Sequence, residues 1–273
     1  MTEAQNPFAN TDGIDGVSAR RAARAQWQTN PAGVVLAGAI KEGTPEFFAE
    51  MTRTRYEAQP WHPALLRGWA PRGTLLEIGC GAGTDHSILR ETADRSIAID
   101  LALRGASLTD TRIGLEGGRG TAIVADGEHL PLANASVDAV YSFGVIHHTD
   151  HPERVVAEMA RTMRPGGSFL VAVYHRYSIF ALQKVIYYVL SGRWGHGTWR
   201  RYLAGLEFGG DEQEEPPVIK LYSRRSIRQL FANAGLGELS TTTIHPSGFG
   251  RAVWPEPFER FGWYVVVRGR KPV

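Results

Sequence analysis

The sequence predicts an α/β fold with a mostly parallel sheet that is covered by helices on both faces. Residues 75–78 form a buried apolar run that leads directly into a glycine-rich turn, and a helical pattern follows the turn. Beyond this turn, short apolar runs alternate with helical patterns as far as Tyr174. Strands that alternate with helices are joined by crossover connections, which place the strands parallel to one another.

Length and composition bound the possible functions. A chain of 273 residues can form one large domain or two small ones, and its 43% hydrophobic residues suffice to bury a core. The net charge of +2 gives no global reason to expect a nucleic-acid partner. Cys80 is the single cysteine, which fits a reducing compartment. Because no signal peptide and no stretch of about 18 apolar residues is present, we expect a cytoplasmic protein without stable membrane insertion.

The N-terminal region is expected to form an arm followed by a helical cover. Residues 1–40 are expected to be a partly disordered arm with a short helix over 22–28, and residues 41–273 the main domain. Residues 44–46, Thr-Pro-Glu, combine a capping hydroxyl, a helix-starting proline and an acid, and they predict a helix to about residue 58. Aromatic residues of this region either pack against the sheet or cover a ligand: Trp27, Phe47, Phe48, Tyr56 and Trp61.

The rest of the chain continues the alternation and contains one interruption. Residues 175–222 are too long for an ordinary connection, so we interpret them as an inserted lid after the fifth strand, with an apolar run over 179–190. Residues 164–167, Arg-Pro-Gly-Gly, are expected to end a helix. Helices are expected over residues 85–92, 103–115, 150–163 and 224–234, and strands over 96–99, 121–124, 137–143, 169–174, 239–244 and 263–267.

The glycine-rich turn has the properties of a ligand-binding loop. Gly79, Gly81 and Gly83 alternate, so the backbone can adopt positive φ and no side chain keeps a ligand away. A dinucleotide fingerprint has its third glycine at the sixth position, but here Thr84 stands there and the glycine comes one residue early. Cys80, inside the turn, is interpreted as a small packed residue rather than a nucleophile.

Acidic residues stand at the ends of three consecutive predicted strands. Glu77 precedes the turn, Asp100 ends the second strand, and Asp126 follows the third. Because α/β sheets bind ligands at the carboxyl ends of their strands, the three acids together favour a binding site over three solvated strand ends. A carboxylate such as Asp100 can accept both hydroxyls of a ribose, and Asp126 can accept a hydrogen bond from an adenine amino group.

A second motif lies on the fourth strand and beyond it. Residues 137–148 read Val-Asp-Ala-Val-Tyr-Ser-Phe-Gly-Val-Ile-His-His, and Arg-Pro-Gly-Gly follows the next helix. Together with Glu-x-Gly-x-Gly-x-Gly at residues 77–83, this pattern resembles the class I S-adenosylmethionine (SAM) methyltransferases. Within that family it is similar to the group of ubiquinone- and menaquinone-methylating enzymes and many natural-product enzymes. Val137, Ile146 and Met163 depart mildly from the family pattern.

This resemblance implies a Rossmann-like, seven-stranded sheet whose last strand is antiparallel. It implies SAM as cofactor, S-adenosylhomocysteine as product, and methyl transfer to oxygen or nitrogen of a small molecule, with natural-product tailoring as the expected role. Some base-modifying methyltransferases carry Asn/Asp-Pro-Pro-Tyr where this chain has Phe-Gly-Val-Ile at residues 143–146, so nucleic acid is not the expected acceptor. The residues expected to bind SAM are Glu77, Gly79, Cys80, Gly81, Gly83, Asp100, Leu101, Asp126, Gly127, Glu128, Phe143 and Gly144.

Three histidines are candidates for a base that removes a proton from the acceptor. His147 and His148 end the second motif, His175 follows the fifth strand, and imidazole titrates near neutrality. These histidines can equally pack or cap a helix. No metal site is expected, because the spacing of His147, His148 and His151 matches no metal motif, and Asp150 sits where an acid favours a helix start.

Three alternative functions remain open from the sequence. The apolar run over 179–190 favours a quinone or lipid as acceptor. A glycine turn is shared with nicotinamide-dependent oxidoreductases, although Thr84 weighs against this class. A protein can also bind SAM without catalysis. N-terminal helices can exchange between subunits, so a homo-oligomer is compatible with the sequence.

Overall fold

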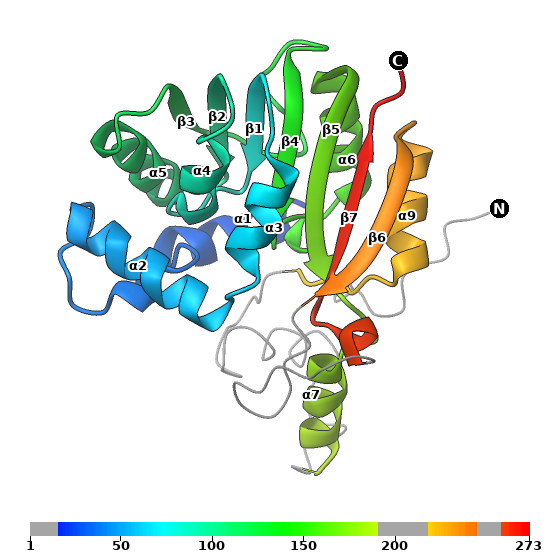
Figure 1. The fold of residues 1–273 in the computed structure, drawn as a ribbon. Helices are drawn as coiled ribbons and strands as arrows, with labels where there is room; N and C mark the ends of the chain where they lie inside the picture. The colour runs from blue at the N-terminus through cyan, green and yellow to red at the C-terminus, as the bar shows by residue number, and fades with distance from the viewer. Residues whose placement is uncertain (1–15, 191–217, 245–257) are drawn as a thin grey trace.

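The structure is a computed structural model, and it describes residues 16–190, 218–244 and 258–273 (Figure 1). Within these residues, seven strands form one sheet in the order β3-β2-β1-β4-β5-β7-β6. β7 is antiparallel to both of its neighbours, and the other paired strands are parallel, which confirms the predicted fold class. The strands are β1 (Thr74–Ile78), β2 (Arg95–Asp100), β3 (Gly120–Val124), β4 (Val137–Phe143), β5 (Met163–Tyr174), β6 (Gly237–Ile244) and β7 (Tyr264–Arg270).

Helices cover both faces of the sheet (Figure 1). One buried apolar cluster joins the sheet to α6 and α9, and a second joins the opposite face to α3. Side chains alternate along each strand, so Leu76 and Ile78 belong to the first cluster and Leu75 to the second. The helices are α1 (Gly16–Thr29), α2 (Pro45–Ala58), α3 (His62–Trp69), α4 (Thr84–Leu89), α5 (Leu103–Leu115), α6 (Pro152–Thr162), α7 (Ile179–Leu190) and α9 (Arg224–Asn233), with short 3-10 turns η1 (Val34–Ala37), η2 (Ile146–His148) and η3 (Phe258–Phe261).

Helix starts follow the capping residues that the sequence supplies. The Thr44 hydroxyl accepts a hydrogen bond from Phe47 N at 3.2 Å, directly before α2, and Pro45 occupies the first turn. Ser223 and Ser226 form a reciprocal capping box at the start of α9. These caps satisfy N–H groups that a helix leaves unpaired at its start, so both predicted helix starts are confirmed.

Two expected boundaries are wrong. The sequence predicts a first helix only over residues 22–28, but α1 begins at Gly16. Its alanine- and arginine-rich sequence has high helix propensity although it contains few apolar residues. The Arg-Pro-Gly-Gly segment lies inside β5, which begins at Met163 rather than at residue 169. The register between β4 and β5 shifts there, so the segment forms a bulge on a longer strand.

The predicted lid is described only in part. It begins with α7, and its residues 191–217 lie outside the described part of the chain, as do residues 245–257 before η3. His175 and Tyr222 form an isolated bridge, so the two ends of the insertion meet beside β5. Of the described helices, none has the length and apolar character that a bilayer span needs.

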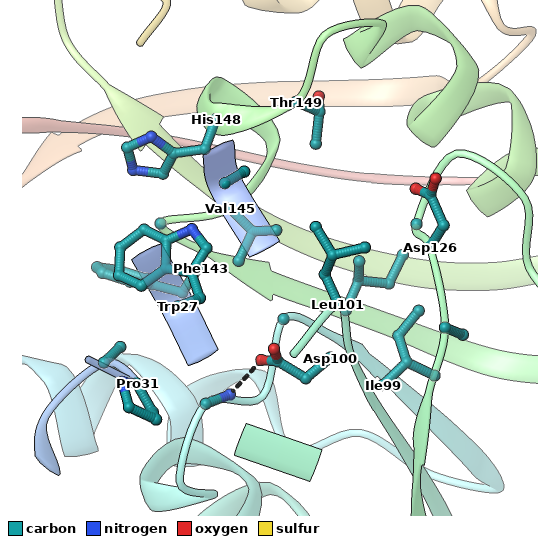
Figure 2. A pocket seen from close by; sticks show the side chains of 18 residues that line it. Trp27, Pro31, Ile99, Asp100, Leu101, Asp126, Phe143, Val145, His148 and Thr149 are labelled. Atoms are coloured by element: carbon teal, nitrogen blue, oxygen red, sulfur yellow. Dashed lines mark hydrogen bonds between the residues drawn. The ribbon is translucent and has the colours of Figure 1, made fainter. Parts of the chain in front are cut away.

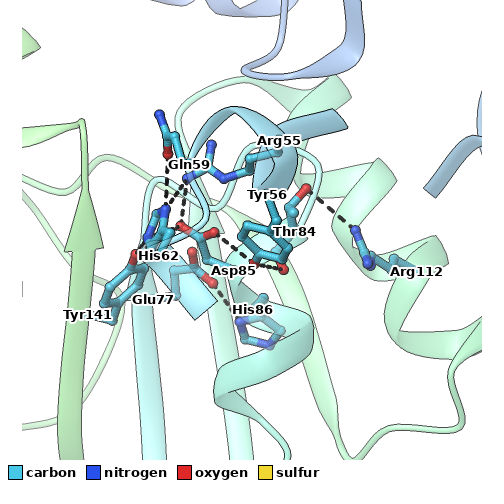
Figure 3. Close-up of polar contacts among 10 residues, drawn as sticks. All are labelled: Arg55, Tyr56, Gln59, His62, Glu77, Thr84, Asp85, His86, Arg112 and Tyr141. Carbon is cyan, nitrogen blue, oxygen red and sulfur yellow. Dashed lines mark hydrogen bonds and ion pairs between the residues drawn. The ribbon is translucent and has the colours of Figure 1, made fainter. Parts of the chain in front are cut away.

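A buried polar network joins the N-terminal cover to the sheet (Figure 3). Asp85 in α4 is its centre, because its Oδ2 accepts hydrogen bonds from Arg55 Nη2 at 2.9 Å and from the Tyr141 hydroxyl at 2.8 Å. The same hydroxyl lies 3.1 Å from Nε2 of His62. Burial opposes ionisation of Asp85, but the charges of Arg55 and His62 hold the pKa of its carboxyl below the usual value. The network therefore ties α2, α3, α4 and β4 together.

Substitution of Tyr141 by Phe tests the contribution of this network. Without the hydroxyl, a buried carboxylate and a buried imidazole each lose a partner, so we expect Tyr141→Phe to lower the free energy of unfolding by about 1–3 kcal/mol. Urea-induced unfolding followed by circular dichroism measures the change. Tyr177→Phe, at an exposed tyrosine, is the control and should change stability by less than about 0.5 kcal/mol. Equal stability of the two variants would show that the network does not stabilise the fold.

Candidate functional site

A pocket opens at the carboxyl edge of the sheet, beside the point between β1 and β4 where the strand order reverses (Figure 2). Such a switch point is where open α/β sheets bind ligands. The segments that follow β1, β2, β3 and β4 form one side of the pocket, and α1 with the segment after it forms the other. The lining residues are Ala23, Trp27, Pro31, Ala32, Ile78, Gly79, Gly81, Ile99, Asp100, Leu101, Ala125, Asp126, Gly127, Phe143, Gly144, Val145, His148 and Thr149.

The turn after β1 requires glycine for two separate reasons. Gly79 has a φ of 78°, and a Cβ atom there would overlap the side chain of Val145. Gly83 has a φ of 74° and precedes α4, where a Cβ atom would press on Thr109 of α5. Gly79 N donates a hydrogen bond to the Ile99 carbonyl oxygen at 2.8 Å, which holds the turn against β2. The turn is thus shaped by contacts with β2, with the segment after β4 and with α5.

Asp100 presents an oriented carboxylate to the pocket (Figure 2). Its Oδ2 accepts a hydrogen bond from Gly81 N at 2.8 Å, and its Oδ1 accepts one from Ala102 N at 2.9 Å. Burial raises the pKa of the Asp100 carboxyl, while these backbone donors oppose that shift. Because both oxygens are held by the main chain, each points in a fixed direction and keeps a lone pair for a ligand hydroxyl.

Asp126 and Glu128 lie after β3 and differ in their exposure to the pocket. Asp126 lines the pocket, and its Oδ1 accepts a hydrogen bond from Glu128 N at 2.9 Å. The Glu128 side chain is buried outside the lining, where its Oε1 accepts a hydrogen bond from His151 N at 3.0 Å before α6. Arg20 Nη1 on α1 lies 3.5 Å from Asp126 Oδ2 and 3.6 Å from Glu128 Oε2. This ion pair brings α1 to the carboxyl edge of the sheet.

Three further residues expected at the cofactor lie outside the pocket lining. The Glu77 carboxylate points into the core, where its Oε2 is 2.8 Å from His86 Nδ1, and His86 Nε2 is 2.9 Å from the Ser96 hydroxyl. Burial raises the pKa of the Glu77 carboxyl and of the Cys80 thiol, so Cys80 lacks the character of a reactive thiolate. Gly83 forms the cap of α4. In the structure, these residues support the turn from behind.

His148 is the candidate base that lines the pocket (Figure 2). Its Nδ1 lies 2.9 Å from the carbonyl oxygen of Val218. A carbonyl oxygen can only accept a hydrogen bond, so Nδ1 carries the proton and the lone pair of the neutral ring is on Nε2. The ring of Trp27 on α1 meets the imidazole edge-on, with 5.4 Å between ring centroids. The backbone and α1 together fix the orientation of this imidazole.

His147 and His175 lie outside the pocket lining. His147 is fully buried between the rings of His148 and Tyr174, at centroid distances of 4.1 and 3.8 Å. Neither of its ring nitrogens has a hydrogen-bond partner in the described part of the chain, and burial lowers the pKa of this imidazole well below its usual value. The Nδ1 of His175 donates a hydrogen bond to the Gly262 carbonyl oxygen at 3.0 Å, and burial lowers its pKa as well.

Sequence reasoning missed several apolar lining residues and the contribution of α1. The sequence leaves Trp27 as either a core or a covering residue, and the structure places it at the pocket. Arg20, Ala23 and Trp27 stand at helical spacing, so a longer predicted helix would have shown that they share one face. Val145 and Thr149 belong to the second motif, yet the motif does not indicate which of its side chains turn towards the ligand.

The burial of His147 predicts a loss of stability in mild acid. Below about pH 6.5 the unfolded chain protonates this imidazole, whereas the native state keeps it neutral, so the free energy of unfolding falls by about 1.4 kcal/mol per pH unit. His147→Phe should lower the pH slope of the free energy of unfolding by the contribution of about one proton. Urea unfolding between about pH 5.5 and 7.5 measures it. An unchanged slope in His147→Phe would contradict the prediction.

Comparison with known proteins identifies one region of the chain. Residues 76–171 match the methyltransferase domain family. Methyltransferase AacuQ of Aspergillus aculeatus is 35% identical over 103 residues, which are 37% of this chain and 32% of that protein. A Mus musculus protein named probable tRNA methyltransferase 9B is 27% identical over 139 residues, which are 50% of this chain and 28% of that protein. The chain thus spans about a third of the length of these curated relatives.

Solved structures share the fold. One is the Burkholderia thailandensis 1,6-didemethyltoxoflavin-N1-methyltransferase with bound 1,6-didemethyltoxoflavin and S-adenosylhomocysteine. It aligns with a TM-score of 0.58 at 15% identity and covers 95% of this chain and 92% of its own. At this identity the likeness is one of fold. With the family match, this topology shows that the chain contains a class I SAM-dependent methyltransferase domain.

Proposed function

We propose that the chain transfers a methyl group from SAM to an oxygen or nitrogen atom of a small-molecule acceptor, in the cytoplasm and as a natural-product tailoring step. The observation that carries this proposal is the arrangement of one pocket. It combines a close-approach glycine turn at Gly79, an oriented carboxylate at Asp100, a second carboxylate at Asp126, and the imidazole of His148. These groups supply the binding and proton-accepting functions that the reaction needs.

The residues of the pocket fit a sulfonium nucleoside. In this proposal the two held oxygens of Asp100 accept hydrogen bonds from the ribose hydroxyls. Ile99 and Leu101 supply apolar surfaces on which an adenine ring can lie, and Asp126 accepts from its amino group. The bare backbone at Gly79 and Gly81 leaves room for the amino-acid part of the cofactor.

The chemistry divides between the cofactor and the chain. SAM supplies an electrophilic methyl group on a positively charged sulfur atom. The chain therefore has to hold the acceptor in line with that group, exclude water and remove one proton. We assign proton uptake to Nε2 of His148, because Nδ1 already carries the proton that it donates to the Val218 carbonyl oxygen. The buried His147 and the backbone-bonded His175 lie outside the pocket lining and are not assigned this role.

A small-molecule acceptor is favoured by several independent features. The net charge of +2 supplies no strong attraction for a polyanion. Aromatic side chains stand around the pocket region: Phe143 meets Tyr264 at a centroid distance of 4.7 Å, and Trp27 meets His148. The Burkholderia enzyme with the same fold has 1,6-didemethyltoxoflavin bound, whereas the mouse relative is named for tRNA. Labelled SAM offered with tRNA and, separately, with phenols and amines distinguishes the two: transfer to tRNA alone would overturn this assignment.

Replacement of Asp100 tests cofactor binding. Asp100→Ala removes the carboxylate that is proposed to accept both ribose hydroxyls, so we expect the affinity for S-adenosylhomocysteine to fall by about a hundredfold. Isothermal titration calorimetry measures the affinity. Asp94→Ala, at an exposed acid outside the pocket, is the matched control and should bind like wild type. A thermal shift with NADH but none with S-adenosylhomocysteine would replace the proposal by a nicotinamide-dependent reaction.

Replacement of His148 tests proton removal. We expect His148→Gln to lower kcat by roughly 10²–10³ with a hydroxyl or ammonium acceptor, because glutamine cannot take up the proton. The loss in kcat should far exceed any loss in S-adenosylhomocysteine affinity. His175→Gln is the control, because His175 lies outside the pocket lining, and its kcat should stay near the wild-type value. Full activity of His148→Gln would show that another group, or solvent, accepts the proton.

A further inference from the structure

A second cavity opens at the amino edge of the sheet, at the beginnings of β1, β4 and β5, with a volume of about 590 Å³. This edge carries the C terminus and is opposite to the edge from which α7 leaves (Figure 1). Trp69 and Arg72, at and after the end of α3, line the cavity together with residues of β5 and β7. Leu170 lies opposite Arg268 in the antiparallel pairing and belongs to the cluster under α3, so Ser168 and Arg268 share that face.

Arg268 carries a guanidinium group that the described part of the chain leaves without a partner. Its Nε is buried and makes no hydrogen bond, and no carboxylate of the described residues pairs with the group. Burial lowers the pKa of this guanidinium, and no neighbouring acid raises it. A charge that is partly withdrawn from water is costly unless it is paired. The arginine therefore indicates a place for an anion from outside the chain.

The two acids that line the cavity are already paired with other groups. Asp138 accepts a hydrogen bond from Thr74 N at 2.8 Å and forms an ion pair with Arg164 at 2.5 Å. Glu238 lies 3.5 Å from Nε of Arg270. The positive charge of the cavity is thus not neutralised by its own acids.

The other polar groups of the cavity suit the same kind of ligand. Arg72 is exposed and makes no ion pair with any described residue, and the Ser168 hydroxyl has no hydrogen-bond partner among them. A guanidinium fork binds the paired oxygens of a phosphate or a carboxylate, and a second guanidinium and a hydroxyl can donate to the oxygens that remain. The indole of Trp69 adds an apolar surface beside them.

We propose that this cavity is a second ligand site, which binds the phosphate or carboxylate group of a small molecule through Arg268, Arg72 and Ser168. The volume of the cavity lies within the range of roughly 300–1,000 Å³ that small-molecule sites occupy. The site lies at the edge of the sheet opposite to the Asp100 pocket, so both sites can be occupied at once. It does not depend on the proposed methyl transfer.

Thermal unfolding with inorganic phosphate or with benzoate, each against sodium chloride at equal ionic strength, tests this site. At least one of the two anions should raise the Tm with concentration, and that dependence gives the affinity. Arg268→Gln should lower the affinity on the order of tenfold to a hundredfold, because the charged, bidentate contact is lost. Arg268→Lys should lower it less, because the charge remains without the fork. Arg225→Gln, at an exposed arginine of α9 on the opposite face of the sheet, is the matched control and should bind like wild type.

The two anions distinguish the source of the bound group. A response to phosphate alone would assign a phosphorylated ligand, and a response to benzoate alone would assign a carboxylate whose ring lies against Trp69.

Three results would overturn the proposal of a second site. These are a Tm that neither anion raises above the chloride control, an equal loss of affinity in Arg268→Gln and Arg225→Gln, and an anion response that saturating S-adenosylhomocysteine abolishes. The third result would place the anion in the Asp100 pocket. Circular dichroism shows that each variant is folded. The measurement needs neither SAM nor an acceptor, so a failure of the proposed methyl transfer would leave it independent.

Discussion

The pocket depends on the way the turn after β1 is fastened to β2. Gly79 N and Cys80 N both donate to the Ile99 carbonyl oxygen, at 2.8 and 3.0 Å, and Gly81 N donates to the Asp100 carboxylate. Three consecutive N–H groups thus converge on the end of one strand. The carboxylate that faces the pocket is therefore also a structural part of the turn. The geometry of the pocket and the local folding of the turn cannot be changed independently here, because they use the same hydrogen bonds.

The buried ion pair between α2 and α4 supports the neighbouring part of the same side of the pocket, at the end of β4. The Arg55 guanidinium lies 5.7 Å from the centroid of the Phe143 ring, and the His62 imidazole lies 4.3 Å from it. Phe143 lines the pocket, so the network that holds the cover helices also supports this side chain from behind. Charged groups are costly to bury unless they are paired, and here Asp85 provides the pairing. The same residues therefore position the cover helices α2 and α3 and the Phe143 side chain that lines the pocket.

Much of the fold and part of the site could be predicted from sequence, for identifiable reasons. Strand ends and glycine turns are local signals, so the sequence alone predicts that Gly79, Asp100 and Asp126 lie at the binding edge of the sheet, where they line the pocket. The direction of a side chain within a turn is not a local signal. His147 and His148 are neighbours in sequence, yet the 3-10 turn η2 directs one into the core and the other to the pocket.

The remaining differences between the predicted and the observed structure arise from tertiary contacts. Glu77 is in the expected strand, but its carboxylate pairs with His86, which becomes its neighbour only through the fold. The length of α1 was underestimated because its sequence lacks a strong apolar periodicity, and its approach to the pocket depends on the Arg20 ion pairs across a gap of more than a hundred residues. Such long-range contacts cannot be read from one sequence, because no residue type specifies its partner.

The contact between His148 and Val218 has a consequence for variation among descendants of this gene. The acceptor is a main-chain oxygen, which is present whatever amino acid occupies position 218. A codon change there alters the apolar side chain and leaves the acceptor in place. Only an insertion or deletion that displaces the segment can remove it. The hydrogen bond of the His148 ring is therefore unaffected by point mutations at position 218, but it is sensitive to changes in the length of that segment.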